Sequence, residues 1–122
     1  MLLQAASPLA LPIIVLDPDT LAPAKQVSQP AIIPLLSTGS TSAVPLLHID
    51  GAFTSASKIR ELAKLVDVVT IEIEHINVDA LEEIAEEFKS IGGRSGKGIK
   101  VFPSPSVIRI IQDKYSQKAY LA

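Results

Sequence analysis

Short apolar runs that alternate with helical patterns most constrain the fold of this chain. Ile13–Leu16 is a continuous run rich in β-branched residues. Such runs are typical of strands that are buried on both faces of a parallel sheet. An Asp-Pro-Asp turn at residues 17–19 ends the run. The other segments with this strand-like character are Leu46–Ile49, Val68–Ile73 and Lys100–Phe102.

Helical periodicity fills the spaces between the later strands. The helices predicted from apolar residues three and four positions apart span about residues 59–66, 79–88 and 105–115. The second of these helices is expected to start from Asn77 or Asp79, since Asp79 and Glu82 have the spacing of a capping box, and Gly92 is a normal stop signal. Ser104 followed by Pro105 is typical of a helix start, and a break is expected near Asp113. Strands and helices in this order predict an α/β fold with a mainly parallel sheet.

The region between the first two strands has a different composition. Residues 20–45 are rich in Pro, Ser and Thr, and residues 29–45 are predicted to form an irregular, solvated insertion. Before the first strand, Met1–Ala6 is expected to be the end of a helix, because Pro8 disfavours helix at the residue before it.

Composition excludes several classes of function. The chain has 122 residues, enough for one small domain, and a net charge of -2 with mixed signs, so nucleic acid is not an expected partner. Cysteine is absent, which excludes disulfides and thiolate chemistry. No stretch approaches the roughly 20 apolar residues that span a bilayer. The apolar start carries no basic residue and is interrupted by prolines, unlike a signal peptide. The expectation is a cytoplasmic protein without a membrane partner.

Two candidate sites lack residues that their chemistry requires at a fixed spacing. The glycine-rich segment Gly92–Gly98 suggests a phosphate loop, but the residue five before Gly96 is Ile91 rather than glycine, and no Ser or Thr follows Lys97. A flexible basic loop is the favoured interpretation. His48 has no second histidine or cysteine at metal-ligand spacing, so a packed or edge residue is favoured over a ligand.

The segment from Val68 to His75 is the most informative for chemistry. In a strand, Thr70, Glu72 and Glu74 share one face, and the alternate apolar residues face a core. Carboxylates at the carboxyl end of a strand lie where open α/β sheets bind ligands, and they accept hydrogen bonds from ribose hydroxyls or ring amines. A half-exposed edge strand with solvated glutamates explains the same pattern equally well.

Several runs in order resemble the phosphoribosylaminoimidazole carboxylases of the ATP-grasp superfamily, most closely the fungal type. The resemblance covers nearly the whole chain apart from the insertion and the glycine-rich loop, and its most specific parts are Glu72–His75 and Ile108–Tyr115. The remaining matching runs are Ile14–Asp19, Ala22–Ala24, Gly51–Phe53, Ile59–Ala63, Asp79–Glu83 and Pro103–Val107.

The resemblance implies a carboxylase of purine biosynthesis, classed among the lyases (decarboxylases). Such an enzyme converts aminoimidazole ribonucleotide to its carboxylated form with ATP and bicarbonate, and Mg2+ neutralises phosphate charge. The family's magnesium ligands lie beyond residue 122, so no metal ligand and no catalytic residue is assigned here. Within the family pattern, Glu72 matches a glutamate of the ribonucleotide pocket, Glu74 and His75 are its neighbours, and Lys114 matches a basic position near ATP phosphate.

The resemblance also implies a domain organisation. Residues 1–103 correspond to a Rossmann-like pre-ATP-grasp domain with an insertion at about 29–45, and residues 104–122 to the start of the ATP-grasp region. The family opens with a strand and a glycine-rich loop, whereas Met1–Ala6 resembles the middle of the following helix. The expectation is an amino-terminal fragment, inactive by itself, whose unpaired strand edge favours aggregation or a homo-oligomer.

Two other functional classes remain open on the sequence. One is a non-catalytic nucleotide-binding or interaction module derived from the same fold. The other is part of an unrelated Rossmann-like dehydrogenase, which requires a glycine fingerprint of different spacing upstream.

Overall fold

The computed structural model describes residues 5, 9, 11–28, 31–34 and 43–122. The chain divides into two compact units, Met1–Ala52 and Phe53–Ala122, which are described separately below. Of the predicted amino-terminal helix at 1–6, only Ala5 lies within the described residues.

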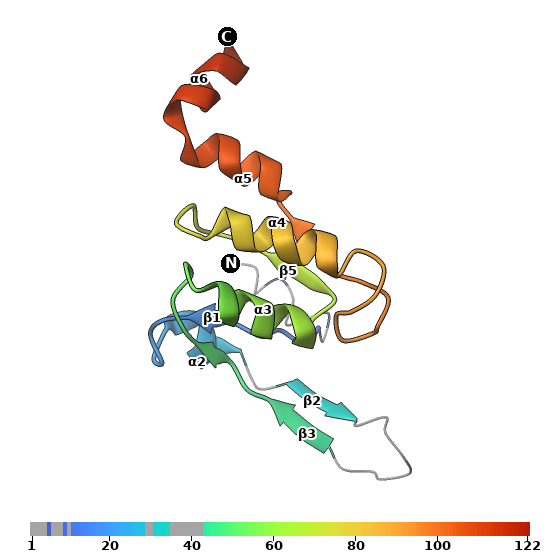
Figure 1. Cartoon of the computed structure of the whole chain (residues 1–122). Coiled ribbons are helices and arrows are strands. Elements are labelled where there is room, and N and C mark those ends of the chain that lie inside the picture. Colours follow the sequence, from blue (N-terminus) through green and yellow to red (C-terminus); the bar gives the residue numbers. More distant parts are fainter. Residues whose placement is uncertain (1–4, 6–8, 10, 29–30, 35–42) are drawn as a thin grey trace. The chain divides into compact units, whose positions relative to one another are not determined.

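The first unit contains one parallel strand pair and a short helix (Figure 1). Strand β1 (Leu16–Asp17) pairs with β4 (Ile49–Asp50), with Leu16 opposite Ile49. Strands therefore form at the ends of the predicted segments 13–16 and 46–49, and each begins later than predicted. The Val15 carbonyl, just before β1, also accepts the Ile49 N–H at 2.9 Å. Helix α2 (Pro23–Val27), which the sequence did not predict, starts with proline in its first turn, where the missing N–H costs nothing.

The prediction that residues 29–45 are irregular is wrong in part. Strand β2 (Ala31–Pro34) pairs antiparallel with β3 (Ala43–Leu46), and Ile32 lies opposite Pro45. Pro45 lacks an N–H, but both strands of a two-stranded ribbon are edges, so proline is tolerated there. The prolines that suggested a loop therefore accompany a β-hairpin.

The second unit carries the alternating pattern that the sequence predicts. In chain order its elements are α3 (Ala56–Leu65), β5 (Val68–Thr70), α4 (Val78–Glu87), β6 (Lys100–Phe102), α5 (Pro105–Gln112) and α6 (Lys114–Leu121). Strands β5 and β6 pair parallel, with Val69 opposite Val101. Figure 1 shows α5 and α6 as separate helices, and the break at Asp113 is confirmed. The α/β class with parallel strand pairs is confirmed.

Apolar side chains from three helices form the core of the second unit. Ile59, Leu81 and Ile84 are the largest fully buried side chains, and Ala63 and Ile108 join them. Burial of each large aliphatic side chain contributes about 1.5–3 kcal/mol. Because Ile59 lies on α3, Leu81 on α4 and Ile108 on α5, this core fixes the helices against one another.

The start of α4 differs from the predicted capping box. Asn77 is the N-cap, and its side chain accepts the Ala80 N–H at 3.0 Å. Asp79 and Glu82 bind Arg109 of α5 instead, at 2.6 and 2.8 Å. The two carboxylates raise the pKa of Arg109 further above its ordinary range, mainly because they accept hydrogen bonds from its guanidinium. The contribution of Glu82 is the larger, and that of Asp79 is the second. A partner distant in sequence thus replaces the local cap.

The glycine-rich loop connects α4 to β6 by backbone contacts. Gly98 has a φ of +95°, and a Cβ there would lie 2.5 Å from the Lys89 carbonyl oxygen, so a side chain cannot be accommodated. The Asp67 carboxylate accepts the Ser95 N–H at 2.7 Å and holds the loop from the start of β5.

Within the described residues, no helix has the length and apolar character needed to cross a membrane.

Candidate functional site

A groove of about 490 Å3 lies in the second unit beyond the end of β5. Its walls combine apolar side chains with two carboxylates and an imidazole. The lining residues are Ile71, Glu72, Ile73, Glu74, His75, Pro103, Ile108 and Ile111. The structure therefore brings together the three residues predicted for ribonucleotide binding, with a wall from α5 that the sequence did not assign.

The strand predicted for Val68–Ile73 is shorter in the structure, and residues 71–75 lie outside any strand. Strand β5 ends at Thr70, although the Ile71 N–H still donates to the Phe102 carbonyl at 3.1 Å. On the partner side β6 ends at Phe102, and the chain continues through Pro103 into α5. Without a partner the alternation of faces is lost, and Ile73, predicted to face the core, is 39% exposed.

The carboxylates of the groove are open to solvent. Glu72, Glu74 and His75 are all exposed. The His75 Nε2 lies 3.9 Å from the Glu74 Oε1, a weak contact between two exposed side chains. Among the described residues, no cation and no hydrogen-bond donor of the chain lies against the Glu72 carboxylate. The groove therefore presents an unneutralised carboxylate beside an apolar wall.

The last residue of α5 reaches the same segment. Gln112 Nε2 donates to the Glu74 carbonyl at 2.6 Å and to the Ile76 carbonyl at 2.8 Å. These contacts join residues 38 and 36 positions apart, so no local pattern could have revealed them. The only signal in the sequence was that Gln112 lies within the specific run Ile108–Tyr115.

Lys114, predicted to lie near ATP phosphate, occupies the first position of α6. It follows Asp113, whose side chain accepts the Tyr115 N–H at 2.9 Å and caps the helix. Lys114 is exposed and is not among the residues that line the groove. The carboxylate groove and Lys114 are thus separate features of the second unit, and the role of each stays a prediction.

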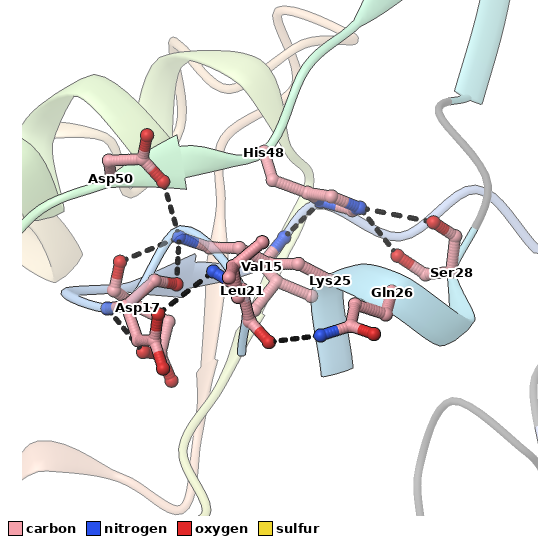
Figure 2. Close-up of polar contacts among 9 residues, drawn as sticks. Val15, Asp17, Leu21, Lys25, Gln26, Ser28, His48 and Asp50 are labelled. Atoms are coloured by element: carbon pink, nitrogen blue, oxygen red, sulfur yellow. Dashed lines mark hydrogen bonds and ion pairs between the residues drawn. The ribbon is translucent and has the colours of Figure 1, made fainter. Parts of the chain in front are cut away.

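The first unit also has carboxylates at strand ends, and a buried lysine binds there (Figure 2). The buried Lys25 Nζ donates to the Asp17 carbonyl at 2.7 Å, the Asp19 carbonyl at 2.9 Å and the Asp50 Oδ1 at 2.5 Å. The sequence did not single out Lys25, because a lysine in a region rich in Pro, Ser and Thr is typical of a surface residue. Its three partners account for all three ammonium protons.

His48 is a structural residue of the first unit, as the sequence favoured. Its Nδ1 accepts the Val15 N–H at 3.0 Å, and its Nε2 lies 2.6 Å from the Ser28 Oγ (Figure 2). Since Nδ1 accepts, the proton resides on Nε2 in this arrangement. The ring therefore connects the chain before β1 to the residue after α2.

Among the described residues, no group of three or more His, Cys, Asp or Glu side chains lies close enough to share a metal ion. Glu72 and Glu74 alone do not make a magnesium site, so the residues described here do not fit that ion and no chemical step is assigned to it.

Comparison with protein families and solved structures gives consistent matches. Residues 36–112 match the family model described as the ribonucleotide synthetase preATP-grasp domain. A phosphoribosylaminoimidazole carboxylase of Ogataea methanolica is 38% identical over 121 residues, which are 99% of this chain and 18% of that protein. The chain spans less than a fifth of the length of the curated carboxylases it matches first.

Two solved structures from Aspergillus clavatus share the fold. An N5-carboxyaminoimidazole synthase in complex with ADP and 5-aminoimidazole ribonucleotide aligns with a TM-score of 0.70 and 36% identity, over 99% of this chain and 25% of that one. A carboxyaminoimidazole ribonucleotide synthase complexed with ATP aligns with a TM-score of 0.70 and 37% identity over the same shares.

Proposed function

The chain belongs to the ribonucleotide synthetase preATP-grasp family, and on that premise we propose that it forms part of an ATP-dependent carboxylase that acts on aminoimidazole ribonucleotide in purine biosynthesis. The names of the matching carboxylases and of the Aspergillus synthases support this activity. Because the chain spans a small share of those proteins, the carboxylase activity, with its lyase classification, is proposed for the whole protein.

One observation carries the proposal for this chain's own residues: the groove beyond β5 pairs the open Glu72 carboxylate with an apolar wall. A ribonucleotide offers hydroxyl and amine donors that a carboxylate accepts, and a flat heterocycle that packs on aliphatic side chains. Ile108 and Ile111 of α5 supply those aliphatic atoms. Glu72 binds the ribonucleotide in this proposal, and Glu74 and His75 form the rim.

The remaining ligands are assigned less directly. ATP use is supported by the ADP and ATP complexes of the Aspergillus synthases. We place Lys114 near ATP phosphate, at the start of the ATP-grasp region that we propose for residues 104–122. Bicarbonate as co-substrate, Mg2+ held by residues outside this chain, a cytoplasmic location and a homo-oligomeric state complete the proposal.

The substitution Glu72→Gln tests the ribonucleotide site. It keeps the size of the side chain and removes the charge, and a hydrogen bond to a charged group contributes about 1.5–3 kcal/mol. We expect the intact protein to bind aminoimidazole ribonucleotide with an affinity that is lower by roughly tenfold or more and to bind ATP unchanged, as measured by calorimetry. Glu86→Gln on the exposed face of α4 is the matched control. Unchanged ribonucleotide binding in Glu72→Gln would refute the site.

A pair of lysine substitutions tests the ATP assignment. Lys114→Ala is expected to weaken ATP binding, and Lys97→Ala in the glycine-rich loop is expected to leave it unchanged. Equal effects of the two substitutions would indicate diffuse electrostatic attraction and would exclude the specific role of Lys114. Ligand binding without carboxylation in the intact protein would favour the non-catalytic module.

A further inference from the structure

The segment that carries Glu72 is held by backbone contacts only at its ends. The Ile71 N–H donates to the Phe102 carbonyl at 3.1 Å, and the Asn77 N–H donates to the Phe53 carbonyl at 3.2 Å. In the part of the chain that the structure describes, no backbone hydrogen bond joins residues 72–75 to another segment. A segment held in this way depends on side chains for its conformation.

Gln112 supplies that support from α5. Its side-chain amide donates one hydrogen bond to the Glu74 carbonyl at 2.6 Å and one to the Ile76 carbonyl at 2.8 Å. A primary amide has two N–H donors, so both are used on the two carbonyls that flank His75. The contact therefore fixes both the peptide plane that follows Glu74 and the one that follows Ile76, in the segment that carries Glu72.

The helix that presents Gln112 is itself firmly anchored. Ile108 is 3% exposed in the core. One turn before Gln112, Arg109 donates to Asp79 at 2.6 Å and to Glu82 at 2.8 Å on α4. Because residues three apart lie on the same side of a helix, the face of α5 that binds α4 also carries Gln112 toward the segment.

We infer that Gln112 is a positioning residue for ribonucleotide binding, which acts by fixing the backbone that presents Glu72 to the groove. This inference rests on the proposed function of Glu72. It assigns Gln112 no contact with the ligand: its effect on affinity passes through the segment 72–76.

The test compares two substitutions of Gln112 in the intact protein. Gln112→Met keeps the length of the side chain and removes both donors, whereas Gln112→Lys keeps a donor group that can reach the same carbonyls. We expect Gln112→Met to weaken binding of 5-aminoimidazole ribonucleotide by roughly three- to tenfold, since two neutral hydrogen bonds are lost. Gln112→Lys is expected to recover most of that loss. Gln117→Met on α6 is the control and should bind as the parent does.

A double-mutant cycle separates positioning from a general effect on stability. If Gln112 acts through Glu72, the loss in Glu72→Gln/Gln112→Met is smaller than the product of the two single losses. Multiplicative losses, or unchanged affinity in Gln112→Met, would overturn the inference and leave the role of Glu72 intact. Unchanged affinity in Glu72→Gln would instead refute the proposed site, and the inference with it.

Discussion

The two units differ in what surrounds the carboxylates at the ends of their parallel strands. In the first unit, Asp17 and Asp50 end β1 and β4, and the buried Lys25 ammonium binds both strand ends. In the second unit, Glu72 and Glu74 follow β5, and their carboxylates lie open beside an apolar wall. The carboxyl edge of parallel strands is the usual place for ligands in α/β folds, and in the first unit the Lys25 ammonium already occupies part of that edge.

This difference also separates structural polar groups from candidate binding groups. Lys25 binds the backbone carbonyl of Asp17 and the carboxylate of Asp50, and these contacts stabilise the first unit. The core of the second unit contains Leu81 and Ile84, whereas the Glu72 and Glu74 side chains are exposed and take no part in it. We therefore expect a substitution in one unit to leave the stability of the other unit unchanged. Substitutions in the core should lower stability, whereas substitutions in the groove should weaken ligand binding.

The largest expected effect is on the core of the second unit. Leu81→Ala removes a fully buried side chain and is expected to lower the stability of that unit by about 2–5 kcal/mol. Amide hydrogen exchange should accelerate in α3, α4 and α5 and stay unchanged in the first unit. Equal acceleration in both units would show that they unfold together and would contradict the distinction between them.

A smaller effect is expected from the lysine of the first unit. Lys25→Met keeps an apolar stem and leaves the Asp17 and Asp19 carbonyls without their donor, at a cost of about 1–3 kcal/mol. Exchange should accelerate at β1 and β4 only. Lys64→Met, on the exposed surface of α3, is the matched control. A first unit that is unaffected by Lys25→Met would show that the network is incidental.

The smallest effect concerns the pH dependence of the glycine-rich loop. Hydrogen bonds from the Ser95 side chain and N–H lower the pKa of Asp67 below its ordinary value of 3.8. The folded pKa is therefore below the unfolded one, so the stabilisation is present above pH of about 4 and is lost as the pH falls through the folded pKa. In Asp67→Asn, the drop in melting temperature between pH 6 and pH 2.5 should be smaller than in the parent chain. An identical drop would contradict this role.

Local patterns predicted the second unit well because its elements follow from periodicity and punctuation. The helices and β6 lie close to the predicted bounds, since apolar spacing, Ser104–Pro105 and the break at Asp113 are local signals. The sequence could not predict where β5 ends, because that depends on where its partner strand β6 ends. The hairpin of β2 and β3 was missed because its prolines suggested a loop.

The sequence predicted which carboxylates lie at the candidate site, but not the wall and the contacts that surround them. Glu72, Glu74 and His75 were found through their place after a strand and through family resemblance. The apolar wall and the Gln112 contacts depend on how α5 packs, and partners 38 positions apart leave no local pattern. The burial of Lys25 likewise follows from three partners that meet only in the folded chain.

Isoleucine methyl NMR of the intact protein, titrated with 5-aminoimidazole ribonucleotide, tests the central claim most directly. Four isoleucines line the groove, and Ile49 on β4 is a built-in reference in the first unit. The account predicts saturable shifts of the methyl signals of Ile71, Ile73, Ile108 and Ile111, weakened in Glu72→Gln, with Ile49 unchanged. Shifts centred on Ile49, or groove shifts that are the same in the parent and in Glu72→Gln, would contradict it.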